Sequence, residues 1–401
     1  MAYGYRNKII DELLHSLTLA MDMRTSYLLQ SFDSRFQPYV KYLLLERQKE
    51  ITWKNEPLQI LDPCSGRFPT GLHDTLKVDR FKLKIPYAEQ YLLWEVLFDP
   101  GHWREPPDFI FNAEDDDFYP PLENIKSIVN WDWSRKEGLA EIVAELLELY
   151  KEYQLERAST NINLQRHLRS LLAESPKDMQ IIINRTERGL GVTNILVKVV
   201  LNYSSLPAYL QQGNPGQDSA VLHAQFPYPD SVSARVQLFL SPAVEAAFGG
   251  SSKLQVPIFQ PGILLGEYFV MITQLLKRQV QLISDGFDKR KDYISAFVSY
   301  FGKAVLEYDV KTFTKVVLLL EWNDFFFTFT VELPLYFPME HPTFLFKSVY
   351  HNQNRKPYVE KHKDFPYSPR WPGTEMAKRA GSYILDVIKD FQKSSVNNSD
   401  R

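Results

Sequence analysis

Apolar and polar residues alternate in several stretches of the chain, which is the pattern of half-buried β-strands. Lysines alternate with apolar residues over residues 81–85, and a similar alternation covers residues 92–98. Residues 108–111 form a third, shorter apolar stretch. Proline fixes φ and donates no ladder hydrogen bond, so the prolines between the second and third stretches predict a shaped turn.

The same order of elements returns near the C-terminus. Two long strands are predicted in residues 313–333, followed by a turn that Pro334, Pro338 and Pro342 frame, and then by a third strand in which Phe344 and Phe346 share a face. The second of the long strands places its apolar residues on one face: Phe325, Phe327, Phe329, Val331 and Leu333. The chain therefore carries one pattern twice: two strands, a proline-framed turn and a third apolar strand.

Between and around these strands, apolar residues recur at intervals of three and four, which predicts amphipathic helices. The helix around residues 139–153 either continues or restarts after Ser159 toward Glu174, where Pro176 stops it. The other predicted helices cover residues 7–23, a stretch after Pro38, 264–283, a new helix from 287, and 376–391.

The middle of the chain gives strand signals at residues 179–184, 195–203, 220–226 and 234–240. Together with a following helix, these predict a degenerate third module, with residues 226–229 as its turn. The predicted fold class is α+β, with tandem modules of an antiparallel sheet and flanking helices in an elongated arrangement. The predicted limits are an N-terminal helical extension over 1–30, a first module over 31–155, a helical connector and middle module over 156–285, a last module over 286–393 and a disordered tail over 394–401.

Composition narrows the setting of the protein. A net charge of −3 provides no global field for nucleic acid, and no segment approaches the ~18 apolar residues that span a bilayer. One cysteine in 401 residues excludes an intramolecular disulfide framework and favours a reducing compartment. The N-terminus lacks the apolar core of a signal peptide. We therefore expect a cytoplasmic and nuclear protein that binds neither nucleic acid nor membrane.

The repeated strand pattern resembles the way the ubiquitin-conjugating fold enters its active-site region. Ubiquitin transfer passes through a thioester, so a conjugating enzyme needs an accessible thiolate soon after the third strand. No cysteine follows either copy, and Cys64 lies ahead of the first copy in a turn-like context. The sequence predicts no catalytic residue and a recognition scaffold in place of an enzyme. The alternative, a conjugating enzyme that uses Cys64, predicts a reducible ubiquitin thioester on that residue.

Metal and cofactor chemistry have no clear motif either. The eight histidines are scattered and form neither His-x-His nor HExxH. The glycines at 249 and 250 precede a lysine at 253 without the Gly-Lys-Ser/Thr order of a phosphate loop. We expect no metal and no cofactor.

One segment predicts a partner-binding surface. Residues 358–371 carry four aromatic side chains and an arginine among prolines, and aromatic residues with arginine are typical of interaction hot spots. The alternative is a loop that wraps its own domain, with the aromatic side chains filling the sheet edge. The candidate residues are Tyr358, Phe365, Tyr367, Arg370 and Trp371.

Several long strings identify the chain as similar to the brain and reproductive organ-expressed (BRE) family, the noncatalytic subunit of BRISC-type deubiquitinase complexes. They are DRFKLKIPYA, PPDFIF, LSPAVEAAFGGSS, GFDKRKDYISAFVSYFG, EYDVKTFTKVVLLLEW, FKSVYH and FPYSPRWPGTEMAKRA, and they lie within residues 79–385. The first 30 residues show no obvious match. The resemblance implies ubiquitin-conjugating-enzyme-variant (UEV) or RWD-like domains at both ends.

The resemblance also implies partners. They are a zinc-dependent JAMM deubiquitinase, its pseudo-enzyme scaffold and an adaptor with a von Willebrand A-like domain. The implied assembly trims non-degradative polyubiquitin in DNA-damage signalling and in cytoplasmic receptor and spindle processes. Polyubiquitin itself is a further candidate partner. The alternative functions are a free-standing ubiquitin receptor with a UEV fold and a cofactor of a conjugating enzyme.

Overall fold

The computed structural model describes residues 25–53, 56–67, 76–112, 115, 117–176, 178–186, 189–211, 220–228, 231, 234–250 and 254–398. The helix predicted over residues 7–23 lies outside the described residues, as do residues 399–401. The chain forms two compact units. The first unit comprises Met1–Lys198, Val221–Phe239 and Ile258–Phe269, and the second comprises Val199–Ala220, Leu240–Pro257 and Val270–Arg401.

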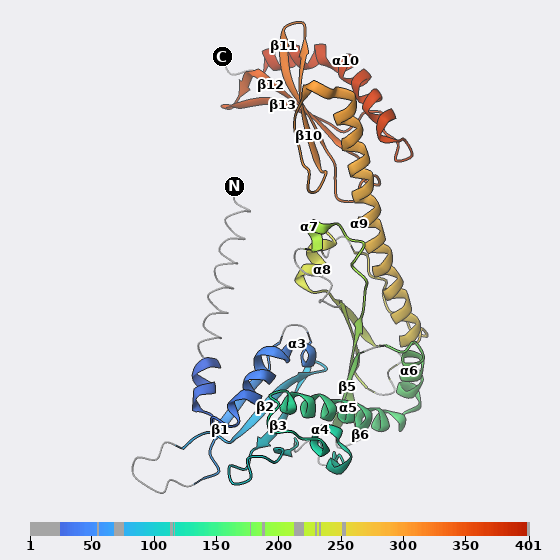
Figure 1. Ribbon diagram of the computed structural model, residues 1–401. Helices are drawn as coiled ribbons and strands as arrows, with labels where there is room; N and C mark the ends of the chain where they lie inside the picture. The colour runs from blue at the N-terminus through green and yellow to red at the C-terminus, as the bar shows by residue number, and fades with distance from the viewer. Residues whose placement is uncertain are drawn as a thin grey trace. The chain divides into compact units, whose positions relative to one another are not determined.

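The first unit contains the first copy of the predicted strand pattern. Its antiparallel sheet has the order β1-β2-β3-β4, and Figure 1 labels β1, β2 and β3. All three strands predicted for this copy are confirmed. In the two longer ones, β2 and β3, apolar side chains at alternate positions are buried. The strands are β1 (Gln59–Cys64), β2 (Arg80–Tyr87), β3 (Gln90–Leu97) and β4 (Asp108–Ile110).

Helices that precede β1 and follow β4 in the chain complete the core of this sheet. Trp94 of β3 and Leu139 and Leu146 of α5 are buried in one cluster with residues of α2. The stretch after Pro38 is helical as predicted, through α2 (Gln37–Lys41), a π-helical turn (Tyr42–Glu46) and α3 (Gln48–Ile51). The strongly periodic helix is α5 (Gly138–Ser159), preceded by a 3-10 turn (Leu122–Asn124) and α4 (Lys126–Val129).

The chain restarts as α6 (Ile162–Ala173), which decides between the two predictions for this region. The Asn161 side chain accepts a hydrogen bond from the Leu164 N–H at 2.9 Å, which caps the new helix. A second sheet of order β5-β6-β7-β8 follows, in which β5–β6 and β7–β8 pair antiparallel, and it packs against α6 and Leu265. Its strands are β5 (Met179–Thr186), β6 (Gly189–Val199), β7 (Ala220–Phe226) and β8 (Arg235–Phe239).

The second unit contains the second copy of the strand pattern. The sheet has the order β13-β12-β11-β10-β9, and α10 (Gly373–Asn397) packs on one face (Figure 1). All five apolar residues predicted on one face of β11 and its extension are buried. The strands are β9 (Val305–Tyr308), β10 (Lys315–Trp322), β11 (Phe325–Glu332), β12 (Thr343–Gln353) and β13 (Lys356–His362). Two short helices, α7 (Ala208–Gln211) and α8 (Pro242–Ala247), come earlier in the chain.

Two predicted limits differ from the structure. The helices predicted over 264–283 and from 287 are one helix, α9 (Leu265–Phe301). Gly286 lies inside this helix and does not end it. A Cβ at this position would come within 2.8 Å of the Phe337 carbonyl oxygen, so the glycine permits close packing there. The tail predicted as disordered from 394 is helical to Asn397. Ser395 is buried and its hydroxyl lies 3.0 Å from the His351 ring, which fixes this last turn.

The α+β class with several sheet-and-helix modules is confirmed. The first compact unit contains both the first and the second sheet. The limits of three separate modules therefore stay a prediction. Among the helices that the structure describes, none is long and apolar enough to cross a membrane.

Candidate functional site

The segment after β4 occupies the place where a conjugating enzyme would need its thiol. Here the buried carboxylate of Asp115 accepts a hydrogen bond from the Tyr150 hydroxyl at 2.7 Å. Arg157 of α5 lies 3.3 Å from the other carboxylate oxygen. The Gln154 amide donates to the Tyr150 hydroxyl at 2.8 Å and accepts from the Ile183 N–H at 3.1 Å. We call Asp115, Tyr150, Gln154 and Arg157 the Asp115 network.

Burial and charge set the protonation of this region. Burial raises the pKa of Tyr150, and the Asp115 carboxylate raises it further, so the phenol stays a hydrogen-bond donor. The hydroxyl of Tyr153 donates to Asp117, and Arg185 forms an ion pair with the same carboxylate. The Tyr153 hydrogen bond lowers the pKa of Asp117 despite partial burial. Asp115 and Asp117 therefore bind side chains of α5 and β5.

The second unit closes the corresponding place with backbone. After the buried part of β12, the strand continues to Gln353 and returns as β13. Asn354 and Arg355 form the turn, both with positive φ. The hydroxyl of Ser348, only 2% exposed, accepts hydrogen bonds from the N–H groups of Tyr350 and His351 at 3.2 and 3.1 Å. The chain therefore forms a β-hairpin at the point in the sequence where a conjugating enzyme would need its thiol.

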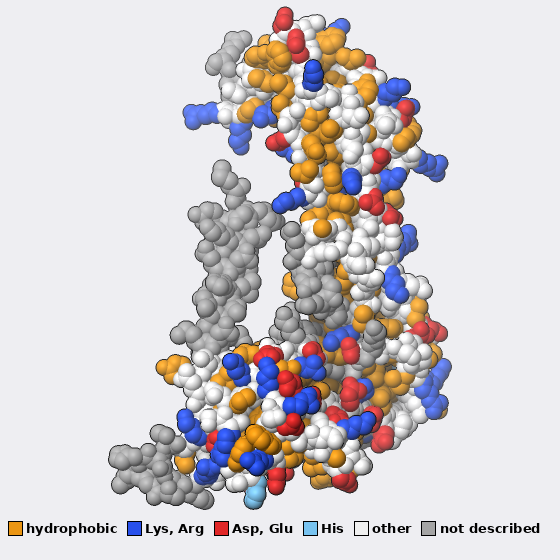
Figure 2. Space-filling view, viewed as in Figure 1, with side chains coloured by type: hydrophobic (Ala, Val, Ile, Leu, Met, Phe, Trp, Pro, Cys, Tyr) orange, Lys and Arg blue, Asp and Glu red, His pale blue; other side chains and the backbone are white. Residues whose placement is uncertain are grey.

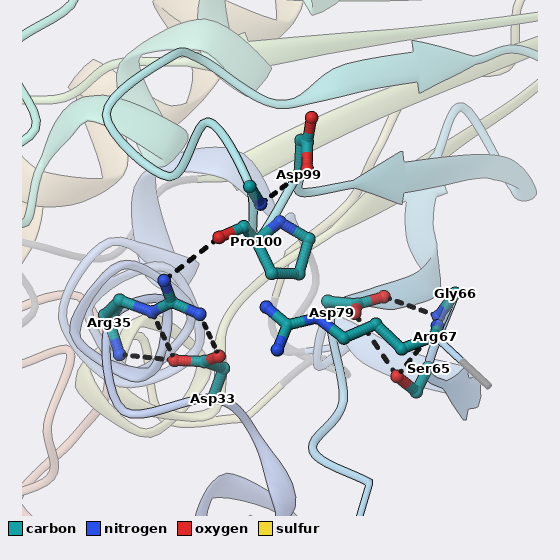
Figure 3. A network of polar contacts seen from close by, with 9 residues as sticks. Asp33, Arg35, Ser65, Gly66, Arg67, Asp79, Asp99 and Pro100 are labelled. Atoms are coloured by element: carbon teal, nitrogen blue, oxygen red, sulfur yellow. Dashed lines mark hydrogen bonds and ion pairs between the residues drawn. The ribbon is translucent and has the colours of Figure 1, made fainter. Parts of the chain in front are cut away.

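Cys64 is exposed and forms the last residue of β1, whereas the sequence predicts a loop position. The strand reaches it through a bulge, because its pairing with β2 shifts between Leu61 and Cys64. Two residues further on, the buried Asp79 carboxylate accepts from the Gly66 N–H at 2.8 Å (Figure 3).

Polar contacts also fix the neighbouring loops. Figure 3 shows Arg35 reaching both Asp33 and the Pro100 carbonyl oxygen, the latter at 3.1 Å. The hydrogen bond from Arg35 lowers the pKa of Asp33.

Over the first unit, Lys and Arg side chains are interspersed with Asp and Glu in the view of Figure 2. Within the described part of the chain, no group of three or more His, Cys, Asp or Glu residues could hold a metal ion.

The structure places two of the five predicted partner-binding residues in the core of the second unit. Phe365 stacks on Phe344, with ring centroids 3.7 Å apart, and Tyr358 packs on Phe391. Both side chains are 7% exposed. These two residues follow the alternative prediction, in which the segment wraps its own domain.

The remaining three lie closer to the surface. The Tyr367 hydroxyl donates to the Pro338 carbonyl at 2.6 Å, so it fastens the proline-framed turn. Trp371 is half-buried beneath Arg379, whose guanidinium carbon lies 3.9 Å from the ring centroid. Arg370 is exposed. Partner binding by this segment stays a prediction, now centred on Arg370 and Trp371.

A groove of about 690 Å³ lies beside the proline-framed turn of the second unit. Its lining includes Lys315, Glu332, Met339 and His341, and Met339 is 76% exposed. The prolines predict the turn but not the groove, because the lining residues come from separate segments that meet only in the fold: β10, β11, the turn, β12 and the residue that follows β13.

Sequence reasoning also missed an exposed aromatic cluster in the first unit. Trp103 and Trp133 lie edge to face, with ring centroids 5.1 Å apart, and the Arg104 guanidinium lies over both rings. The only sequence signal was the Trp-Arg pair inside the first proline-framed turn. Its contact with residue 133 depends on the fold.

Comparisons with known proteins agree on one family. The family model for brain and reproductive organ-expressed protein (BRE) matches residues 30–352. The chain is 39% identical over 378 residues to BRISC and BRCA1-A complex member 2 of Branchiostoma floridae, covering 92% of this chain and 98% of that protein. It is 41% identical over 350 residues to the protein of the same name from Danio rerio, covering 85% and 90%. The chain belongs to the BRE family.

Proposed function

We propose that this protein is a noncatalytic adaptor or scaffold subunit of a BRISC- and BRCA1-A-type deubiquitinase complex. The observation that carries the proposal is the closure of both places where a conjugating fold would hold its thiol. The Asp115 network fills one, and the β12–β13 hairpin fills the other. The names of the two relatives, each a complex member, support the same role.

In this role the protein bridges a JAMM metalloprotease and its pseudo-enzyme scaffold to a von Willebrand A-like adaptor. The protease supplies the metal-bound water that hydrolyses the ubiquitin linkage. This chain supplies sheets and helices as rigid binding surfaces, and supports the trimming of non-degradative polyubiquitin in the nucleus and cytoplasm. Two separate compact units suit a bridging subunit, because each offers its own surface.

Affinity purification of the full-length chain from cell extract tests this role. We expect a JAMM protease in stoichiometric amount at mild salt, and equal recovery with the Cys64→Ser variant, because the exposed thiol has no part in binding. Recovery of the chain without a protease would contradict the proposal. Incubation with activating enzyme, ATP and ubiquitin checks the enzyme alternative, and a reducible thioester lost in Cys64→Ser would favour it.

Direct ubiquitin recognition is a second candidate function, favoured by one surface of the second unit. On the sheet face opposite Phe327 and Phe329, Leu319 and Phe326 are exposed, and Val359 joins them through the paired row from β10 to β13. We expect ubiquitin to perturb this face in an NMR titration of the full chain, and Phe326→Ala to weaken the effect. No perturbation up to millimolar ubiquitin would exclude recognition by this face.

A further inference from the structure

We propose that Trp103, Arg104 and Trp133 form a clasp that binds a carboxylate-bearing segment of a partner protein. The proposal rests on the proposed function, because it assigns a surface of the first unit to another subunit of the complex. The segment would present an Asp or Glu side chain to the guanidinium and a neighbouring apolar side chain to the indole rings. We refer to these three residues as the Trp-Arg clasp.

The geometry of the clasp presents the cation outward. The guanidinium carbon of Arg104 lies 5.0 Å from the Trp103 ring centroid and 5.2 Å from that of Trp133. The two rings cross at 80°. Trp103 packs against the hydrophobic core, Arg104 is exposed, and Trp133 is 45% exposed. The negative ring faces attract the guanidinium and hold its planar fork in place.

Hydrogen bonds within the protein fix the backbone that carries the clasp. The Tyr39 hydroxyl donates to the Trp133 carbonyl. Asp99 accepts from the Gly101 N–H at 2.7 Å and bonds the His102 ring at 2.8 Å, just before Trp103. The same carboxylate raises the pKa of His102. A preordered site loses little entropy on binding, so this support favours recognition over simple surface packing.

Arg104 differs from its cationic neighbours in having no carboxylate partner among the described residues. Arg35 pairs with Asp33, Lys136 with Glu46, and Arg135 with Glu141. The contacts of Arg104 are the two indole rings alone, so its five N–H donors have no protein acceptor in the part of the chain that the structure describes.

Trp371 and Arg379 in the second unit give a comparison. There the guanidinium also covers an indole, but it has its own carboxylate, because Glu375 lies 2.6 Å from Arg379. The Trp-Arg clasp therefore has the stacking without the acid. A bidentate carboxylate from outside would complete it.

The surrounding charges favour a single carboxylate over a polyanion. Asp99 and Asp132 lie on the two segments that form the clasp, and Glu105 follows Arg104 directly. Asp99 binds His102 and Asp132 binds Ser134, and neither carboxylate forms an ion pair with Arg104 in the structure. Their charges repel the closely spaced phosphates of a nucleic acid, whereas one Asp or Glu side chain can meet Arg104 alone. Tryptophan and arginine at an interface centre are the residue types that carry most binding energy.

The test uses the complex purified with the full-length chain. Arg104→Glu should weaken binding of one partner subunit roughly tenfold or more, because it places like charges at the contact. Trp133→Ala should weaken the same partner. Arg104 and Trp133 are exposed enough that both variants should keep the wild-type melting temperature, which checks folding. Arg135→Gln, in which the replaced cation has its own carboxylate, should bind like the wild type.

A crosslinking experiment identifies the acid directly. The amine of an Arg104→Lys variant should react with a partner carboxylate under a zero-length carbodiimide, and mass spectrometry would locate the link. Arg379→Lys is the matched control, and should link to Glu375 in its own chain. If Arg104→Glu assembles normally, or the Arg104→Lys amine links only to Glu105 or Asp132, the clasp is overturned while the proposed function stands. If the wild-type chain recovers no partner subunit, both are overturned.

Discussion

The first and second units close the same place by different means. After β4, the chain is held by buried side chains that join Asp115 to α5 and, through Gln154, to β5. After the buried part of β12, the chain pairs with β13 as a hairpin. In the first unit each link depends on a particular polar side chain, whereas in the second unit main-chain hydrogen bonds provide the closure.

This difference indicates that the strand pattern and the reactive loop are separable. Both units keep two long strands, the proline-framed turn and a third strand, because these bury the apolar faces. Neither unit needs a loop that exposes a thiolate. A buried polar network is demanding, because each of its members must find its hydrogen-bond partner. The hairpin depends on fewer specific side chains, because its strands pair through the main chain.

The largest expected effect tests the core that supports the hairpin. Phe329 is fully buried and contacts Phe344 and Phe346, each with a ring centroid 5.0 Å away. Phe329→Ala should lower the free energy of unfolding by about 3–5 kcal/mol, because it removes a buried ring and leaves a cavity. Phe326→Ala on the same strand, 38% exposed, should cost about 1 kcal/mol or less. Equal costs in urea denaturation would contradict the assigned faces.

The next effect compares the two closures directly. Asp115→Ala removes the acid that both Tyr150 and Arg157 bind, and leaves a nearly buried guanidinium without its partner. We expect a loss of about 2–3 kcal/mol, together with faster hydrogen exchange after β4. Ser348→Ala in the second unit should cost about 1 kcal/mol or less, because the β12–β13 ladder remains. A larger cost for Ser348→Ala would reverse the comparison.

Asp309 adds a pH dependence to the second unit. Partial burial would raise the pKa of this carboxyl, but hydrogen bonds from Thr312, the Lys311 N–H and Thr314 lower it from 3.8 to about 2. A depressed acid pKa stabilises the fold above the unfolded value, and this contribution is lost as the pH falls from about 4 to about 2. Because the carboxyl is only partly buried, solvent screens these interactions, and the contribution is about 1 kcal/mol or less at neutral pH.

Unfolding measured between pH 2 and 7 checks this contribution. Asp309→Asn should be less stable at pH 7 and lose less stability on acidification. Thr312→Val keeps the carboxylate but removes a donor, so its acid transition should move toward pH 4. If all three proteins lost the same stability between pH 7 and pH 2, Asp309 would not be the source of this pH dependence.

Much of the fold could be predicted from the sequence, because alternation along β2, β3 and β11 reports directly on which side chains face a core. The sequence predicts one helix that ends at 283 and another that starts at 287, whereas Gly286 lies inside a single helix because its missing side chain permits close packing against residues 335 and 337. Aromatic side chains in residues 358–371 gave no period, so the sequence could not separate the buried Phe365 from the exposed Arg370.

The candidate sites were harder to predict for a related reason. Asp115 and Arg157 are 42 positions apart, and Trp103 meets Trp133 only after the turn and the later loop have folded. No periodicity connects such pairs, and charge counting treats every exposed arginine alike. The missing thiol was the exception, because an absent nucleophile after a predicted strand needs no tertiary contact to be recognised.

A cysteine introduced after the third strand of each unit should have no effect on ubiquitin thioester formation, which makes this the smallest of the expected effects. A cysteine in place of Ser348 would lie at a position that is 2% exposed, where burial disfavours the thiolate and blocks access. A cysteine in place of Asn112 would be more accessible, but the carboxylates of Asp115 and Asp117 in the same segment disfavour a further negative charge. We therefore expect no reducible ubiquitin thioester with Asn112→Cys or Ser348→Cys on a non-reducing gel, in a Cys64→Ser background, whereas an active conjugating enzyme in the same reaction becomes charged. A thioester on either variant would mean that the closure of that unit still admits the transfer reaction, and that the loss of the cysteine alone separates this chain from an enzyme.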